Sequence, residues 1–216
     1  MHLIIADAEI ELIPDELLKF PAVRATARRR GKKPSECLLD SSLHYSALRH
    51  LKDGGRRGRA DITHFCLLLA LDSIANRKGM LHTFVHTRND LVMEFSPDVR
   101  LPKNYNRFAG LMEDVLVNGG VWSEGRQLIS LKKESLKSLL ERLGGRAYLL
   151  EEDGKQFSSF ASLRDATVII GGFPHGSFIS DVGNMCRRIS ISGEKLMAWS
   201  AVSIVLARAF PAKLYF

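Results

Sequence analysis

Short apolar segments alternate with helical ones along the C-terminal half of this 216-residue chain, and that alternation constrains the fold more than any other feature. Strands are expected over 127–131, 147–150, 167–170 and 188–192, and a long apolar helix over 194–210. A strand, a helix and another strand in succession predict an α/β fold with a parallel sheet and helices on its faces. In such sheets ligands bind beyond the carboxyl ends of the strands.

The N-terminal half continues this α/β pattern. Residues 3–6 are expected to form a buried strand, and 80–86 and 91–95 two strands joined by a tight hairpin. Asp61 is expected to cap a helix. Asn104 is expected to open an amphipathic helix that ends at the glycines following residue 118.

Charge is distributed unevenly along the chain. The whole sequence carries 31 Lys or Arg and 24 Asp or Glu, a net charge of +7. The segment 19–59, here called the basic block, holds twelve Lys or Arg and only three Asp or Glu. A basic block on a nearly neutral body points to a polyanionic partner, either nucleic acid or an acidic membrane surface, with a merely solvated surface as the alternative.

Composition and cysteine usage exclude several classes of protein. A chain with 45% hydrophobic and 25% charged residues is neither disordered nor collagen-like. Its three cysteines, with no C-x-x-C, argue against a disulfide framework and a zinc ribbon. The N-terminus does not resemble a signal peptide, and the longest apolar run, 65–71, is far below the roughly 20 residues that cross a bilayer. A soluble, cytoplasmic protein is therefore expected.

Two loops at strand ends have compositions suited to ligand binding. In residues 169–178 a buried strand runs into a glycine-rich loop, and glycine lets backbone approach a ligand closely. In residues 189–196 a strand turns directly into the last helix, whose first amides can hold polar groups. The sequence lacks G-x-G-x-x-G and a Walker lysine. A structural turn and an ordinary helix cap remain the alternatives for the two loops.

Two segments carry cations in patterns suited to RNA. In R-R-G-R-A-D, Asp61 follows Arg59 by two residues and can aim its guanidinium at a phosphate or base. Arg100, Lys103 and Arg107 are spaced by three and four residues with aromatic residues among them, a pattern that fits RNA phosphates and unstacked bases. A solvated basic surface is again the alternative. The histidines match no metal-binding spacing, and without G-x-S-x-G a serine hydrolase is excluded.

Four blocks of the sequence resemble the pseudouridine N1-methyltransferase family, a SPOUT-class family of small-subunit ribosome biogenesis in archaea and eukaryotes. They are L-D-S-S-L-H at 39–44, R-A-D-I-T-H at 59–64, N-Y-N-R-F-A-G-L-M at 104–112 and G-G-F-P-H-G at 171–176. The resemblance extends over the whole chain. It departs at Ala60, where the family commonly has proline, and at Lys103, where relatives can have arginine.

The resemblance implies a fold that periodicity does not reveal. It implies one domain over 1–216, a parallel sheet with helices on both faces, a C-terminal trefoil knot and a homodimer. A small β-rich extension would fall at 80–100. S-adenosylmethionine would bind in the knot, with S-adenosylhomocysteine as product and no metal.

The resemblance also implies site residues. Arg59, Arg100, Lys103 and Arg107 would bind RNA. Arg59 and Asp61 would be catalytic: Asp61 orients Arg59 and is one candidate acceptor of a proton from the base. The cofactor contacts would come from the two loops and one strand end, namely Leu150, Gly171, Gly176, Ile191, Ser192, Gly193, Glu194, Lys195 and Leu196.

The implied activity is methylation of N1 of a pseudouridine in small-subunit (16S) rRNA during ribosome biogenesis. The implied partners are that rRNA and ribosomal assembly factors, with no membrane. Two alternatives remain: a catalytically idle assembly factor that binds rRNA, and a SPOUT enzyme that methylates tRNA.

Overall fold

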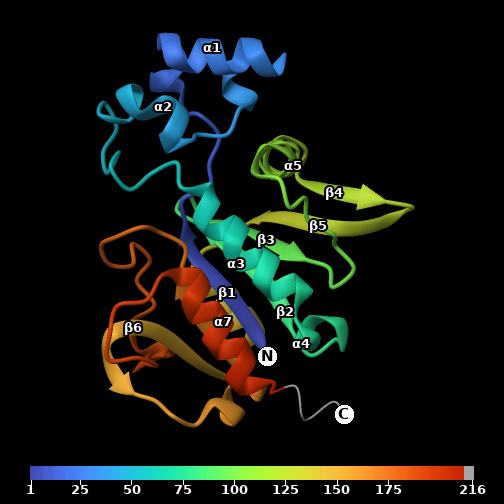
Figure 1. Cartoon of the computed structure of the whole chain (residues 1–216), viewed down its shortest axis with the longest axis vertical. Coiled ribbons are helices and arrows are strands. Elements are labelled where there is room, and N and C mark those ends of the chain that lie inside the picture. Colours follow the sequence, from blue (N-terminus) through green and yellow to red (C-terminus); the bar gives the residue numbers. More distant parts are fainter. Residues whose placement is uncertain (212–216) are drawn as a thin grey trace.

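The computed structural model describes residues 1–211, so residues 212–216, the end of the expected 1–216 domain, lie outside the described residues. The strands of the described chain are β1 (His2–Ala8), β2 (His82–Thr87), β3 (Leu91–Phe95), β4 (Gly120–Ser123), β5 (Arg126–Lys133), β6 (Arg146–Gln156), β7 (Ala166–Gly171) and β8 (Arg187–Ser190). They form a single sheet in the order β4-β5-β3-β2-β1-β7-β6-β8, which runs through the centre of the molecule (Figure 1).

The sheet is mixed rather than parallel throughout. Strands β2, β1, β7, β6 and β8 are parallel neighbours, whereas β3, β5 and β4 are paired antiparallel. The prediction of a parallel sheet is therefore correct only for the half that contains β1 and the C-terminal strands. The hairpin predicted in 80–95 is present, but β2 and β3 lie within the main sheet beside β1 and not in a separate extension over 80–100. The segment that projects from the body is the β4–β5 hairpin (Figure 1).

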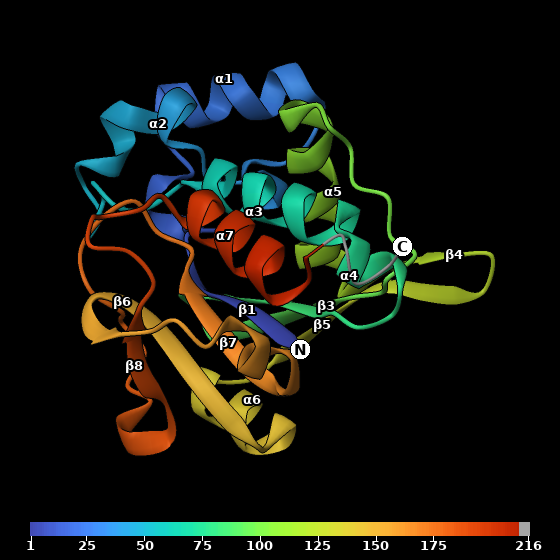
Figure 2. The same cartoon turned by 60° about the horizontal axis from the view of Figure 1, so that its bottom comes forward.

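Helices cover both faces of the sheet, as predicted (Figure 2). The α-helices are α1 (Pro21–Arg30), α2 (Ser41–Leu48), α3 (Ala60–Asp72), α4 (Ile74–Arg77), α5 (Tyr105–Asn118), α6 (Leu136–Leu143) and α7 (Ala198–Ala209). Successive residues of a strand point to opposite faces. Leu3 and Ile5 of β1 accordingly pack with α3, α5 and α7, while Ile4 packs with α6.

Helices α1 and α2 form a layer with its own small core, built on Val23, Leu39 and Leu48. Figure 1 shows this layer beyond the end of the sheet, above α3. The segment 53–59 leads from α2 into α3, so its position is fixed at both ends by packed helices.

Two helix starts differ from the sequence-based expectation. The last helix begins at Ala198 and not at residue 194, because the Ser192 hydroxyl accepts a hydrogen bond from the Glu194 N–H at 3.1 Å and holds a turn there. Residues 191–197 are thus free to form a loop. Helix α3 has Arg59 at its N-cap position, and Asp61 lies in its first turn with its carboxylate directed to Arg59.

Candidate functional site

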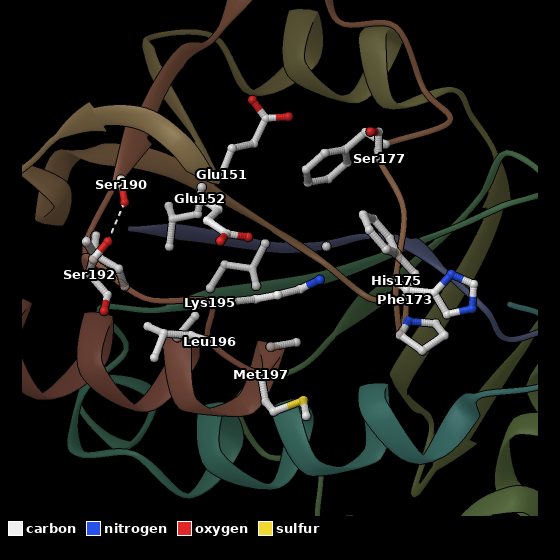
Figure 3. Close-up of a pocket in the computed structure, with 18 of the residues that line it drawn as sticks. Glu151, Glu152, Phe173, His175, Ser177, Ser190, Ser192, Lys195, Leu196 and Met197 are labelled. Carbon is white, nitrogen blue, oxygen red and sulfur yellow. Dashed lines mark hydrogen bonds between the residues drawn. The ribbon is translucent and has the colours of Figure 1, made fainter.

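A cavity of about 860 Å³ lies at the carboxyl ends of β7 and β8 and beside the middle of β6. Its volume is in the range of small-molecule pockets, and its place on the sheet is where parallel α/β sheets bind ligands. Figure 3 shows side chains from the strand ends and from two loops converging on it. The walls are apolar at Ile170, Ile189 and Leu196, with carboxylates at Glu151 and Glu152.

The structure brings nearly all of the expected cofactor residues to this cavity. Those that line it are Leu150, Gly171, Gly176, Ile191, Ser192, Glu194, Lys195 and Leu196. Gly193 belongs to the same loop but does not line the cavity. Lys195 extends its side chain across the opening toward the loop that carries Phe173 and His175 (Figure 3).

The glycines of the first loop have specific reasons for lacking a side chain. A Cβ on Gly171 would lie 2.6 Å from the Phe173 ring, so that ring can cover this strand end only because residue 171 is glycine. Gly176 has a φ of 86°, a conformation that other residues adopt at a cost. The loop therefore presents backbone rather than side chains at these two points.

Leu150 does not end its strand, contrary to the expectation. Strand β6 continues to Gln156, with a shift in its pairing to β8 between Leu150 and Lys155. Gly154 lies in this irregular part, where a Cβ would come within 2.5 Å of the Ile189 backbone. The irregularity places residues 150–153 along the cavity wall.

Arg59 is the predicted RNA-binding residue that the structure places at the cavity. Its Nε and Nη2 donate to the two oxygens of Asp61, each at 2.8 Å, as the R-x-D spacing predicts. The hydrogen bonds to Asp61 raise the pKa of the Arg59 guanidinium, which stays protonated. The side chain is 32% exposed, so a fixed positive charge faces solvent at the cavity edge.

The other predicted RNA-binding residues lie apart from the cavity, around the start of α5. Arg100, Lys103 and Arg107 are exposed, and none forms an ion pair within residues 1–211. Their segment is tied to α3 through His64, whose Nε2 lies 2.8 Å from the Pro102 carbonyl oxygen and whose ring stacks on Phe108 at 4.2 Å. His64 is therefore a buried residue with its ring nitrogen paired, and it connects α3 to the start of α5.

Much of the basic block is neutralised inside the protein. Within the described chain, six of its twelve cations pair with carboxylates: Arg30, Lys32, Lys33, Arg56, Arg57 and Arg59. Six cations of the block have no ion pair with any residue of 1–211, namely Lys19, Arg24, Arg28, Arg29, Arg49 and Lys52. The charge available to a polyanion is therefore smaller than the sequence count indicates.

Sequence reasoning missed a row of buried carboxylates at the end of β1 and just after it. Asp7, Glu9 and Glu11 are at most 4% exposed. Glu9 pairs with Arg56 and Arg88, and Glu11 accepts two hydrogen bonds from Arg57 at 2.7 Å. The signal was available: acidic residues alternating with Ala8 and Ile10 directly after a buried strand cannot all face solvent.

Within residues 1–211 no group of three or more His, Cys, Asp or Glu side chains is arranged to hold a metal ion. In the same part of the chain, no helix combines the length and the apolar character needed to span a membrane.

The burial of His64 predicts how the stability of the protein depends on pH. Burial lowers the pKa of His64 below its usual value, so the unfolded chain takes up a proton as pH falls through about 6.5 while the folded chain resists it. Stability contributed by neutral His64 is present above that pH and lost below it. We expect His64→Gln to reduce the fall in unfolding temperature between pH 7.5 and 5.5. The exposed His50, replaced in the same way, is the control, and an equal effect of both substitutions would contradict the prediction.

The fold and the cavity define a class: an α/β protein that binds a small molecule at the ends of parallel strands, with an arginine at the cavity edge. The EMG1/NEP1 methyltransferase family model matches residues 3–209. The chain belongs to this family.

Individual relatives agree with that assignment. The ribosomal RNA small subunit methyltransferase Nep1 of Thermococcus kodakarensis is 46% identical over 213 residues, covering 95% of this chain and 96% of the relative. The Pyrococcus furiosus protein of the same name is 47% identical over 213 residues, covering 95% of this chain and 94% of that relative. The crystal structure of Archaeoglobus fulgidus Nep1 bound to S-adenosylhomocysteine superimposes with a TM-score of 0.89 at 36% identity, covering 99% of this chain and 98% of that one.

Proposed function

We propose that this chain transfers a methyl group from S-adenosylmethionine to N1 of a pseudouridine in small-subunit rRNA, and that it acts in ribosome biogenesis. One observation carries the proposal: Arg59, held by Asp61, lines the same cavity as the glycine loop 171–176 and the loop 191–197. A single nucleotide can therefore reach the arginine and a ligand in the loops at once.

The residues of the cavity fit this cofactor. Its volume of about 860 Å³ combines apolar walls suited to a purine ring with carboxylates and open backbone suited to hydroxyl and amino groups. Leu150, Ile191 and Leu196 would hold the base, and backbone near Gly171 and Gly176 would contact the polar parts. When bound, the cofactor supplies a sulfonium methyl group that a nitrogen nucleophile can displace.

Arg59 is the residue that we assign to the reacting base. Pseudouridine is joined to its sugar through carbon, so N1 carries a hydrogen. This proton passes to solvent water as N1 gains the methyl group, and S-adenosylhomocysteine is left as the product. A protonated guanidinium at the cavity edge stabilises the negative charge that develops on the base. Both oxygens of Asp61 are bound to Arg59. Asp61 is therefore a positioning residue in this proposal and not the proton acceptor.

The test is a methyl-transfer assay on an RNA hairpin that carries pseudouridine, beside the identical hairpin with uridine. We expect transfer to the pseudouridine hairpin alone. Equal transfer to both hairpins would refute the base specificity.

Two measurements separate the alternatives. Calorimetry that detects no binding of S-adenosylhomocysteine would favour an idle rRNA-binding assembly factor. Transfer to tRNA with none to the rRNA hairpin would favour a tRNA methyltransferase.

We predict that the exposed cations near α5 set RNA affinity without affecting the cofactor. Replacing Arg107 with alanine should weaken RNA binding and reduce the slope of log K against log salt by about one, since one phosphate contact is lost. Arg100→Ala and Lys103→Ala should behave alike. The measurement is RNA binding at several salt concentrations, with S-adenosylhomocysteine affinity determined in parallel.

Lys137→Ala provides the matched control for these substitutions. Lys137 is an exposed cation on α6, which covers the opposite face of the sheet (Figure 2). Equal losses of RNA affinity in the Arg107 and Lys137 variants would show that only net charge matters.

The proposal includes a C-terminal trefoil knot in the segment that carries both loops, and a homodimer. An exposed apolar face supports the dimer. Phe65 and Leu69 of α3 are 50% and 40% exposed, Met197 is 61% exposed, and the Phe65 ring lies 5.4 Å from that of Trp199. A second copy of the chain would cover this face, since patches of this kind mark interaction sites.

The dimer is tested by light scattering coupled to size-exclusion chromatography. We expect the unsubstituted protein to have the mass of two chains. Leu69→Lys should give the mass of one chain, because a charge on the apolar face opposes the burial of that face. Leu43→Lys is a control, because Leu43 is 36% exposed on α2 and belongs to a different surface. A monomeric unsubstituted protein would contradict the proposal.

A further inference from the structure

The loop 172–180 forms one wall of the cavity, and the residues that hold it in place lie outside the cavity. Asp7 accepts hydrogen bonds from the Ser180 N–H at 3.0 Å and the Ser180 hydroxyl at 2.6 Å. The Gly172 N–H donates to the Ala6 carbonyl at 2.7 Å. Both ends of the loop are therefore fixed to the end of β1.

The middle of the loop is held at His175, whose Nε2 lies 3.2 Å from the Gly55 carbonyl oxygen, and by one arginine side chain, Arg56. Its Nη1 donates to the Ser177 carbonyl oxygen at 2.7 Å, and its guanidinium lies over the Phe173 ring at 4.0 Å from the ring centre. A Cβ on Gly176 would lie 3.4 Å from the same Nη1. Arg56 thus contacts the loop at Phe173 and Ser177 and lies beside Gly176, although it does not itself line the cavity.

Arg56 is itself fixed by a buried carboxylate that does not belong to the loop. Its Nε donates to Glu9, which is fully buried and is also bound to Arg88 at 2.8 Å. The Nη2 of Arg56 is buried with no hydrogen-bond partner within the described chain. An unpaired buried donor costs stability, so an ion pair with Glu9 alone does not account for this placement of the guanidinium, which lies over the Phe173 ring.

We infer that Arg56 is a positioning residue for cofactor binding: it holds the middle of the loop 173–178 in the shape that closes the cavity. The inference rests on the proposed function for the identity of the cofactor. Arg56 and Arg59 belong to the same segment, 53–59, so the loop over the cofactor and the arginine at the cavity edge share one support.

Arg57 supplies a matched control within the same segment. It too is nearly buried, with 12% of its side chain exposed against 10% for Arg56, and it too pairs with a buried carboxylate, Glu11. It has no contact with the loop 173–178 within the described chain. Substitution of either arginine therefore removes a buried ion pair, but only substitution of Arg56 also removes a contact with the loop.

The first experiment measures S-adenosylhomocysteine affinity by calorimetry. We expect Arg56→Gln to raise the dissociation constant about tenfold, and Arg57→Gln to leave it nearly unchanged. Arg56→Lys retains the charge beside Glu9 but cannot stack and donate to Ser177 together. It should recover the unfolding temperature without recovering the affinity. Equal dissociation constants for unsubstituted and Arg56 variants, or equal losses in the Arg56 and Arg57 variants, would overturn the inference.

The second experiment needs no ligand. Amide hydrogen exchange over 173–178 should be faster in Arg56→Lys than in Arg57→Lys. Unchanged exchange in this loop would also overturn the inference. If the unsubstituted protein binds no S-adenosylhomocysteine, the proposed function fails, while the exchange comparison still tests the role of Arg56.

Discussion

Replacing Arg59 with alanine is expected to lower kcat for methyl transfer to the pseudouridine hairpin by about a hundredfold or more, the usual effect of removing a charge-stabilising donor from an active site. The physical reason is that the guanidinium, fixed by two hydrogen bonds to Asp61, is already aligned before the reaction and needs no reorganisation. The measurement is single-turnover transfer at saturating RNA, which separates the chemical step from RNA binding.

Two further variants make this prediction specific. Arg59→Lys keeps the charge but loses the paired hydrogen bonds to Asp61, and should recover only part of the rate. Asp61→Asn keeps the shape of the side chain but leaves Arg59 less firmly held. The kcat of this variant should lie between that of the unsubstituted protein and that of Arg59→Ala. S-adenosylhomocysteine affinity should be nearly constant across the series. Unchanged kcat in Arg59→Ala would remove Arg59 from the reaction.

Replacing Glu9 with alanine is expected to lower the free energy of unfolding by about 3–5 kcal/mol, the cost of leaving buried charges without their partner. Glu9 is fully buried and pairs with both Arg56 and Arg88, so its removal takes the buried carboxylate from two guanidinium groups, of which Arg88 keeps the half-exposed Asp53 at 3.6 Å. The measurement is denaturant unfolding, with the slope of the transition checked for constancy.

Asp72→Ala is the control for Glu9→Ala. Asp72 also pairs with an arginine, Arg77, but the two side chains are 82% and 66% exposed. Water and salt screen such a pair, so we expect only a small fraction of the Glu9 effect. If both variants lose the same stability, burial of the Glu9 cluster contributes nothing beyond an ordinary surface pair.

The parts of the site that could be predicted from sequence are those with a local signal. The glycine-rich loop after an apolar strand predicted the cavity position, and the two-residue spacing of Arg59 and Asp61 predicted their contact. The loop 191–197 was only partly predicted, because local serine hydrogen bonds delay the start of α7. Arg56 was not predicted at all, since the residues it contacts are Glu9, Phe173 and Ser177, far away in the chain.

By itself, the sequence determined the alternation of strands and helices, the helix from Asn104 to the glycine stop, the basic block and the family resemblance. Each depends on neighbouring residues, on composition or on motif spacing. Only the tertiary structure decided that half of the cations of the basic block form ion pairs inside the protein, and that the sheet is mixed. It also decided that Arg59 lines the same cavity as loops that lie more than 100 residues later in the chain. These three features depend on which distant segments pack together. The residues that neighbour a charged side chain or a strand in the sequence do not indicate which distant residue or strand it will pair with.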